Sequence, residues 1–397
     1  MKEREDCMKI VILSYNRFPN GDAGAVRDYI FAKMLKELGH NVCIVAMSAS
    51  TNFEVKSYNG VDYISLRNES VETKSRVWNY FGYTKRLFKF IENRFSAELP
   101  DVFWVVNMPL HSLISIKRFA IKKKIKLIHD SVEWYSARQF KLGFLSPEFI
   151  FKELNNRIVV DKNFKVISIS KFLHNYYSNK NISSIRIPII FDKSEINPNK
   201  NIDDERMILL YAGSPGKKDY LHIMIKSLCL LPEHILQKIE FRIIGVNSFD
   251  LDNMFKNDRD TLKKIKVYLN VMGRVPRNEV LKNLTQADFT VLLRDPQLRY
   301  AQAGFPTKVV ESLASSTPVI LNLTSNLGDY LNHLENCIIV ENCSSSAFAE
   351  ALMTAYDVKF LQKNINIIQK NARTTFESHF YYQIYLSKLS EFINGKH

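Results

Sequence analysis

Short apolar runs that alternate with amphipathic segments constrain the fold of this chain more than any other feature. The first run, residues 9–13, is followed by a glycine-bearing loop and then by residues 25–38, whose apolar positions recur at helical spacing. A second apolar run follows at 42–47. Strand, turn, helix and strand in this order form a βαβ unit, which predicts a buried parallel sheet. The pattern continues through four further apolar runs, at 102–107, 126–130, 166–170 and 185–190.

The same rhythm starts again after the polar stretch 191–206. A chain of 397 residues also exceeds the size of one ordinary core. We therefore predict an α/β fold of two Rossmann-like, doubly wound parallel-sheet domains facing a central cleft, with ligands beyond the carboxyl ends of the strands. The predicted domains are 1–195 and 205–375, followed by a C-terminal helix, 376–397, that packs back toward the first domain. The strands predicted in the second domain are 207–213, 241–245, 266–273, 289–294 and 318–322, alternating with helices such as 222–231 and 277–284.

Composition argues against several classes of protein. The chain is 46% hydrophobic and 24% charged, so it can build two cores and is not wholly disordered. No apolar run approaches the roughly 20 residues that span a bilayer, and the start shows no small-residue cleavage site, so we expect a cytoplasmic protein. The five cysteines are scattered without metal-type spacing. We expect them to be reduced thiols, mostly in the core, and we expect no metal site.

Residues 303–320 hold the most informative local pattern. Gly304 opens a turn, and residues 307–314 then have the pattern of a helix. A helix that begins after a glycine turn offers unpaired backbone N–H groups and a partial positive charge, which suit a diphosphate. Thr307 is expected to cap this helix, and Glu311, one turn in, to accept hydrogen bonds from two ribose hydroxyls. The alternative is an ordinary capped amphipathic helix with a solvated glutamate.

This segment resembles the donor-binding signature of the retaining glycosyltransferases of family four, which have the GT-B fold. Four other stretches agree with that family in the same order along the chain: 166–173, 186–192, 211–218 and 271–293. The chain most resembles the bacterial members that build surface polysaccharides. The resemblance implies that the first domain binds the acceptor and that the second binds a nucleotide sugar.

The resemblance also implies roles for individual residues of the donor site. Lys217 or Lys218 corresponds to the lysine that clamps the phosphates, and Arg274 to a residue beside the base. Segment 305–311 resembles branches of the family with a Pro-Thr-Lys sequence, which makes Lys308 a candidate contact to hexose or phosphate. Ordinary surface lysines and arginines are the alternative. The donor-binding candidates are Gly213, Lys217, Arg274, Arg294, Arg299, Ala303, Gly304, Phe305, Thr307, Lys308 and Glu311.

Two positions depart from the family pattern. Ala303 stands where the family has the first of two glutamates, so we expect hexose recognition to differ and to involve Gln302 or Arg299. Ser214 stands where an arginine usually follows the glycine of the phosphate loop. Arg294 and Arg299, just beyond a predicted strand end, are candidates to replace that charge.

His129 ends a predicted strand at the place where the family often has a cleft-facing histidine near the donor hexose. With Lys218 and Glu311 it completes the set of catalytic candidates, although a structural role for the histidine is the alternative. Two acids after the strand and two glycines of the first loop are candidates to contact the acceptor. These acceptor-binding candidates are Gly21, Gly24, Asp130 and Glu133.

Positive charge is concentrated in the first half of the chain. Residues 1–195 hold 31 Lys and Arg against 20 Asp and Glu, which accounts for most of the net charge of +14. Within residues 70–126, basic and aromatic residues interleave on predicted amphipathic helices, a pattern that suits an anionic membrane surface. We therefore expect peripheral contact with the inner face of the plasma membrane, and a solvated basic face is the alternative. No nucleic-acid module is recognisable, so no nucleic-acid partner is expected.

Taken with the resemblance, these features predict a metal-independent, retaining hexosyltransferase. The donor would be a UDP- or GDP-linked sugar, which is a substrate rather than a cofactor, and the acceptor a polysaccharide or lipid-linked oligosaccharide. The alternatives are a catalytically weak sugar-nucleotide-binding partner of another transferase and a GT-B sugar-nucleotide 2-epimerase. A dehydrogenase is disfavoured, because no G-x-G-x-x-G sequence follows a strand.

Overall fold

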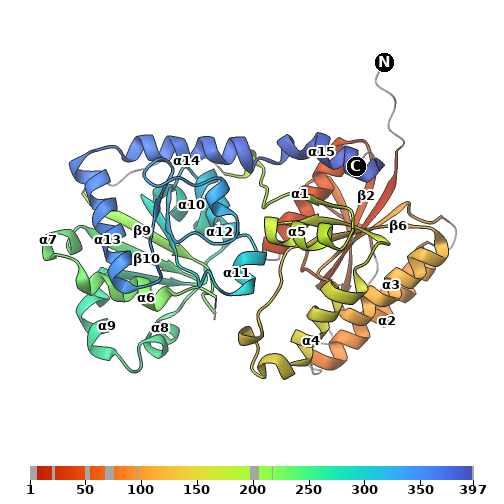
Figure 1. Ribbon diagram of the computed structural model, residues 1–397, viewed down its shortest axis with the longest axis horizontal. Coiled ribbons are helices and arrows are strands. Elements are labelled where there is room, and N and C mark those ends of the chain that lie inside the picture. Colours follow the sequence, from red (N-terminus) through yellow and green to blue (C-terminus); the bar gives the residue numbers. More distant parts are fainter. Residues whose placement is uncertain are drawn as a thin grey trace, which may run out of the picture. The chain divides into compact units, whose positions relative to one another are not determined.

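The computed structural model describes residues 7–19, 23–49, 54–67, 76–95, 98–196, 205–216 and 218–395. The chain divides into two compact units, each built around its own sheet. The first unit consists of Met1–Ile190 with Tyr382–His397, and the second of Phe191–Tyr381. Figure 1 shows helices on both faces of each sheet, which is the layered arrangement that buried parallel strands require.

The first unit contains an eight-stranded sheet in the order β3-β4-β2-β1-β5-β6-β7-β8. Neighbouring strands are parallel except β3 and β4, which are antiparallel. The order runs outward in both directions from β1, which confirms the predicted doubly wound sheet. The strands are β1 (Lys9–Ser14), β2 (Asn41–Ala49), β3 (Lys56–Tyr58), β4 (Val61–Arg67), β5 (Val102–Val106), β6 (Lys126–Ser131), β7 (Phe164–Ser168) and β8 (Ser184–Arg186).

The β3–β4 hairpin is a feature that the apolar pattern does not predict. All three residues of β3 are exposed, so the strand shows no alternation of buried and exposed positions. Its turn contains Asn59 and Gly60, with φ of 46° and 78°. Asn and Gly adopt such left-handed conformations more readily than other residues, which is why they favour tight hairpins.

Helices cover the first sheet on both faces (Figure 1). The first helix, α1, ends before Gly39, whose φ of 88° is the left-handed conformation in which many helices end. A π-helical turn, Asn155–Val159, continues α4. The predicted strand 185–190 is shorter than expected, because Pro188 has no N–H to donate to a ladder. The helices are α1 (Ala23–Glu37), α2 (Arg76–Arg94), α3 (Leu110–Lys123), α4 (Pro147–Leu154), α5 (Lys171–Asn179) and α15 (Leu386–Asn394).

The second unit contains a six-stranded sheet in the order β11-β10-β9-β12-β13-β14, with every neighbouring pair parallel. All five predicted strands are present. The predicted strand 266–273 begins later than expected, because Lys266–Tyr268 forms a 3-10 turn. The strands are β9 (Met207–Ala212), β10 (Ile239–Ile244), β11 (Leu269–Gly273), β12 (Phe289–Leu292), β13 (Val319–Leu321) and β14 (Cys337–Ile339).

Alternate residues of β9 divide the core of the second unit between the two faces of its sheet. Leu209 and Tyr211 pack with apolar residues of α6, α8, α9 and α13, whereas Ile208 and Leu210 pack with α10. The helices are α6 (Leu221–Lys226), α7 (Glu233–Leu236), α8 (Ser248–Met254), α9 (Arg259–Ile265), α10 (Arg277–Gln286), α11 (Arg299–Ala303), α12 (Thr307–Ala314), α13 (Ser345–Tyr356) and α14 (Ile365–His379).

Two further findings bear on the sequence predictions. The five cysteines are free, but only Cys337 is buried, and Cys7 and Cys229 are exposed, so the expectation that most of them lie in the core is wrong. Within the described part of the chain, no helix combines the length and the apolar character needed to cross a membrane.

Candidate functional site

A pocket lies at the carboxyl edge of the second sheet, beside the ends of β9, β10 and β11. Its volume of about 720 Å³ is within the usual range of small-molecule sites. Ligands of open parallel sheets bind at this edge, because the loops after the strands meet there. The pocket is lined by Ser214, Pro215, Gly216, Gly245, Val246, Asn247, Asp250, Met254 and Arg274.

Glycines stand at the ends of the three strands that border this pocket. Gly213, Gly245 and Gly273 all have positive φ, of 138°, 91° and 67°. A Cβ on Gly245 would lie 2.7 Å from the carbonyl oxygen of Gly213, and a Cβ on Gly213 would lie 2.5 Å from Cε of Lys308. The backbones of Gly213 and Gly245 therefore approach each other at a distance that only glycine permits, and a side chain on Gly213 would displace the end of Lys308.

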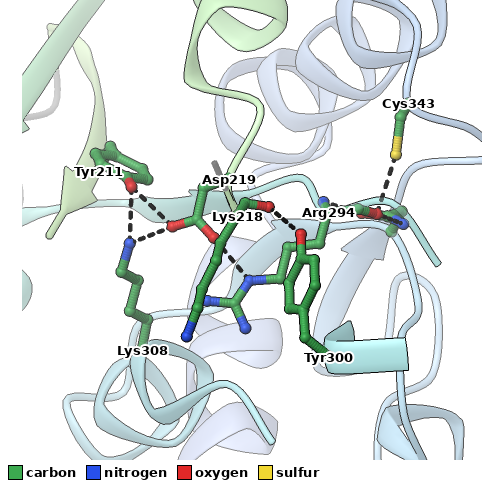
Figure 2. Close-up of polar contacts among 8 residues, drawn as sticks. Tyr211, Lys218, Asp219, Arg294, Tyr300, Lys308 and Cys343 are labelled. Carbon is green, nitrogen blue, oxygen red and sulfur yellow. Dashed lines mark hydrogen bonds and ion pairs between the residues drawn. The ribbon is translucent and has the colours of Figure 1, made fainter. Parts of the chain in front are cut away.

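A buried carboxylate gathers two cations at the same edge (Figure 2). Asp219, in the loop after β9, accepts a hydrogen bond at Oδ1 from Arg294 Nε at 2.7 Å and at Oδ2 from Lys308 Nζ at 2.6 Å. The hydroxyl of Tyr211 also donates to Oδ2, at 2.7 Å, and Lys308 Nζ donates to that hydroxyl at 2.8 Å. Lys308 Nζ lies 4.0 Å from the centroid of the Tyr211 ring. These contacts join the loop after β9, the end of β12 and the first turn of α12.

The electrostatics of this cluster follow from burial and charge. The side chain of Asp219 is 2% exposed, and burial alone would raise the pKa of its carboxyl group. The charges of Arg294 and Lys308 outweigh that effect and hold the pKa of Asp219 below its usual value. Burial lowers the pKa of the Lys308 amine, against the attraction of Asp219. The cluster therefore sets two basic side chains, Arg294 and Lys308, against one buried carboxylate.

Helix α12 spans the predicted residues, Thr307–Ala314. Thr307 does not cap it: Pro306 occupies the N-cap position and makes no side-chain hydrogen bond, so that expectation is wrong. The missing cap is consistent with a helix end whose N–H groups are left for a ligand. One turn in, Glu311 accepts a hydrogen bond at Oε1 from Arg277 Nη1 at 2.9 Å. The Arg277 side chain is half exposed and that of Glu311 is mostly buried.

In the first unit, His129 lies near the end of β6 against the rings of Phe164 and Tyr177. Its side chain is almost completely buried, and burial lowers its pKa to about 4. His129 is therefore neutral at physiological pH. It lines a small pocket together with residues of the loops after β5 and β6, of α4 and of the π-helical turn that follows α4, including Asn107, Glu133, Lys152 and Asn155.

The acceptor-binding candidates lie in different settings within the first unit. Asp130 is fully buried, and its two carboxylate oxygens accept hydrogen bonds from Arg27 Nε at 2.7 Å and Nη2 at 2.9 Å. Glu133 lines the pocket beside His129. Gly24 belongs to the first turn of α1, where an added Cβ would lie 2.7 Å from the side chain of Asn16. Gly21 lies outside the described residues.

Comparison with known proteins identifies the second unit. Residues 192–374 match the family model of glycosyl transferases group 1, a segment that covers almost all of this unit. The second unit is a glycosyl transferases group 1 domain. This match agrees with the resemblance based on residues 303–320. No curated protein sequence matches the chain significantly.

Solved structures match both units together. Sucrose-phosphate synthase from Thermosynechococcus elongatus gives a TM-score of 0.77 at 12% identity, with 98% of each chain covered. Anabaena HepE in complex with UDP gives 0.68 at 13% identity, covering 98% of this chain and 100% of the other. A glycosyltransferase from Rickettsia africae gives 0.66 at 16% identity, with 98% of each chain covered. This similarity shows that the chain has the predicted GT-B fold.

Within the group 1 domain, Arg274 lines the pocket and Thr307 and Glu311 belong to α12, whereas most of the other donor-binding candidates fall into two sets. Gly213, Arg294 and Lys308 meet at the charged cluster around Asp219, and Lys218 directly precedes that carboxylate. The carbonyl oxygen of Lys218 accepts a hydrogen bond from the hydroxyl of Tyr300 at 2.5 Å, which anchors the loop. Lys217 lies outside the described residues.

The second set surrounds the short helix α11. Arg299 is its first residue, and Gly304 follows its end. Ala303 is completely buried. The ring of Phe305 packs against Tyr330 and Phe380, at centroid distances of 6.0 and 5.7 Å, so it anchors the turn that leads into α12.

Sequence reasoning did not identify Asp219 or Tyr211, the two residues that tie the cations of the group 1 domain together. Asp219 follows two lysines in a loop after a strand, and Tyr211 lies within an apolar strand, so neither has a distinctive local signal. Asp219 and Arg294 are 75 positions apart in the sequence. Their pairing depends on the adjacency of β9 and β12 in the sheet.

Proposed function

We propose that this protein is a retaining glycosyltransferase that moves a hexose from a UDP- or GDP-linked sugar to a polysaccharide or lipid-linked oligosaccharide acceptor. The observation that supports this most strongly is the cluster of Arg294 and Lys308, with the adjacent Lys218, at the glycine-lined edge of a group 1 domain. Glycosyl transfer builds negative charge on the leaving diphosphate while the anomeric carbon becomes oxocarbenium-like. Cations fixed at the diphosphate stabilise that transition state.

In this proposal the nucleotide lies along the carboxyl edge of the second sheet. The base occupies the pocket beside Arg274, and Glu311 accepts hydrogen bonds from the ribose hydroxyls. The diphosphate contacts Lys308, Arg294 and the N-terminus of α12, whose partial positive charge adds to theirs. Two structures of HepE contain UDP and UDP-glucose, which supports a UDP-linked donor for this chain. We propose that the first unit binds the acceptor near His129 and Glu133.

The test is a panel of UDP- and GDP-sugars incubated with the protein, with and without lipid-linked acceptors, followed by measurement of nucleotide release and of the product anomer. Release that depends on an acceptor, with a retained anomer, is the expected result. Binding without turnover would indicate a sugar-nucleotide-binding partner of another enzyme. Conversion of the donor without any acceptor would indicate an epimerase.

The ribose contact has its own test. Glu311→Ala is expected to weaken binding of the cognate nucleotide diphosphate about tenfold or more, because a bidentate charged hydrogen-bond acceptor is lost. Glu350→Ala removes an exposed glutamate from α13, which packs on the opposite face of the sheet from α10, and serves as the matched control. Equal affinities of the two variants in calorimetric titration would argue against the site.

We propose that the reaction does not require a metal ion, because basic side chains and a helix end can neutralise the leaving group. Asp250 and Asp252 form an Asp-x-Asp triplet on α8, and Asp250 lines the pocket. A metal-dependent reaction is therefore the alternative to be tested. Asp250 forms a capping box with Asn247, accepting from its backbone N–H at 3.4 Å. Turnover that survives EDTA supports the proposal, and turnover that returns only with Mg²⁺ or Mn²⁺ contradicts it.

We also propose that the first unit contacts anionic membrane, through its basic surface and an apolar turn. Tyr83, Leu87 and Phe90 of α2 are buried, so the aromatic residues within 70–126 whose side chains are described serve mainly as core. Large apolar side chains are exposed instead before α4, where Leu142, Phe144 and Leu145 are 66%, 77% and 80% exposed. Figure 1 shows α2, α3 and α4 gathered at one end of the first unit.

Exposed apolar groups beside cations suit a lipid interface. Flotation with anionic and with neutral vesicles tests this contact. Wild-type protein is expected to float with anionic vesicles at low salt, and Phe144→Ser with Leu145→Ser to abolish flotation. Flotation that is indifferent to vesicle charge, or to these substitutions, would argue against it.

A further inference from the structure

We propose that Asp219 is a positioning residue of the donor site, which holds Lys308 and Arg294 in the orientation that the leaving diphosphate requires. The inference rests on the proposed function. No local sequence signal points to Asp219, and it contacts the proposed diphosphate only through its neighbours. The structure nevertheless gives it the central place in the charged cluster.

Both oxygens of the Asp219 carboxylate are used, and each fixes a different cation. Oδ1 accepts from Arg294 Nε at 2.7 Å, and Oδ2 accepts from Lys308 Nζ at 2.6 Å. Because the Asp219 side chain is only 2% exposed, water competes weakly for these bonds. A carboxylate engaged at both oxygens in this way sets the distance and the angle between the two cations.

Tyr211 restrains Lys308 from a third direction. Its hydroxyl accepts from Lys308 Nζ at 2.8 Å and donates to Asp219 Oδ2 at 2.7 Å. The amine of Lys308 thus uses two of its three N–H donors, which leaves one for a ligand. Among the described residues, Nη1 and Nη2 of Arg294 have no hydrogen-bond partner, so they are available to phosphate oxygens.

The elements that carry these side chains are themselves anchored. The backbone N–H of Arg294 donates to Asn322 Oδ1 at 2.9 Å, and Asn322 Nδ2 donates back to the Arg294 carbonyl at 2.7 Å. The hydroxyl of Tyr300 donates to the carbonyl of Lys218, next to Asp219. The backbone beside Asp219 is therefore anchored by a bond that involves neither of the two cations.

A carboxylate beside a diphosphate site has opposite effects on binding and on turnover. Its negative charge repels the diphosphate and so weakens ground-state binding. Its hydrogen bonds keep Lys308 and Arg294 from separating through mutual repulsion, so that both face the leaving oxygen when charge develops there. Loss of the charge alone should therefore leave nucleotide affinity intact or increase it, while turnover falls.

The experiment compares Asp219→Asn with the wild-type protein in UDP and GDP titrations and in turnover of the cognate donor. We expect kcat to fall about tenfold or more, while the Kd of the nucleotide diphosphate stays unchanged or decreases. The matched control is Asp288→Asn, which alters another buried Asp–Lys pair of the same unit, Asp288 with Lys359 at 2.7 Å. That control should lose stability but keep the kcat and Kd of the folded protein.

Each outcome discriminates. If wild-type protein neither binds a nucleotide diphosphate nor turns over a sugar nucleotide, the proposed function and this inference both fail. If wild-type protein is active and Asp219→Asn keeps its kcat, or loses affinity and kcat together as an unfolded site would, only the inference fails. Should Asp219→Asn not fold, Asp219→Glu decides, because it keeps the negative charge but moves the carboxylate oxygens that hold the two cations. A kcat at least threefold lower at unchanged Kd supports the inference, and a wild-type kcat overturns it.

Discussion

The stability of the first unit should depend on pH through one buried carboxyl group, Asp28 in α1. Its side chain is 1% exposed, and Oδ2 accepts hydrogen bonds from Ser14 Oγ at 2.6 Å and Asn16 Nδ2 at 3.0 Å. Oδ1 is buried without a partner among the described residues. Burial raises the pKa of Asp28 from 3.8 to about 7, and the two hydrogen bonds only partly oppose this effect.

The sign of the pH dependence follows from that direction. Below pH 3.8 the carboxyl group is protonated in both the folded and the unfolded chain, so it costs nothing. As pH rises from there toward 7, the unfolded chain loses the proton and the folded chain keeps it, so stability falls. At pH 8 the full cost is about 4 kcal/mol, and between pH 5 and pH 8 it grows by about 2–3 kcal/mol.

Asp28→Asn removes this charge and keeps an oxygen that can accept from Ser14 and Asn16. The variant should therefore gain stability over wild type as pH rises, by about 2–3 kcal/mol between pH 5 and pH 8. For a unit of this size, that gain corresponds to a rise of roughly 5–10 °C in Tm relative to wild type. The prediction concerns the difference in unfolding free energy between Asp28→Asn and wild type, because His129 and other groups contribute equally to the pH dependence of both proteins.

Scanning calorimetry at pH 5, 6, 7 and 8 measures this difference, with the transition of the first unit followed separately from that of the second. Asp62→Asn, which removes an exposed carboxylate from β4 of the same unit, is the matched control and should differ little from wild type at each pH. A difference between Asp28→Asn and wild type that stays constant across this range would refute the reasoning.

Three further substitutions test other contacts. Gly213→Ala should cost the second unit about 1–3 kcal/mol and weaken UDP binding, because Gly213 has a φ of 138° and an added Cβ would displace the end of Lys308, whose Cε would lie 2.5 Å away. Unfolding and nucleotide titration measure the two effects, and wild-type values for both would contradict this prediction. The wild-type protein should lose stability as pH falls from 6.5 toward about 4, since burial keeps His129 neutral while the unfolded chain takes up a proton, and His129→Gln should reduce this loss. Urea unfolding measures it, and an equal loss of stability in the variant and the wild type would contradict the prediction. Lys359→Met removes the cation that pairs with the buried Asp288 carboxylate and should cost about 3–5 kcal/mol, with UDP affinity unchanged in the folded protein. Unchanged stability would count against a tight ion pair.

Periodicity predicted most of the framework that carries the site. Strand β9 and helix α12 are apolar or amphipathic over their whole length, and α12 has the predicted bounds, 307–314. The exposed strand β3 has no such pattern, because its pairing with β4 depends on a tight turn rather than on burial. Periodicity therefore predicts the longer elements that bury one face, whereas the exposed strand β3 and the three-residue strand β14 were not predicted.

The donor site was predictable as a set of residue types but not as a set of contacts. Lys308 and Arg294 lie at a helix start and a strand end, which is where ligands of parallel sheets bind. Their common partner Asp219 could not be chosen from sequence, because many acids follow strands in this chain. Only the order of β9 and β12 in the sheet brings this carboxylate between the two cations.

The arrangement of the cations explains how the chain can depart from the family pattern and still present positive charge at the donor site. The resemblance implies an arginine directly after the glycine of the phosphate loop, where this chain has Ser214. A diphosphate responds to the position of a charge and not to the strand that supplies it. Arg294 reaches the loop from the end of β12, and Lys308 from α12, and both meet Asp219 there. A charge supplied from a distance in sequence needs an anchor to hold its orientation, and Asp219 provides one. On this reasoning, Ser214→Arg should restore turnover to Arg294→Ala only if Asp219 also orients the new guanidinium group. If Ser214→Arg fully restored turnover to Arg294→Ala in a protein that also carries Asp219→Asn, the need for an anchor would be contradicted.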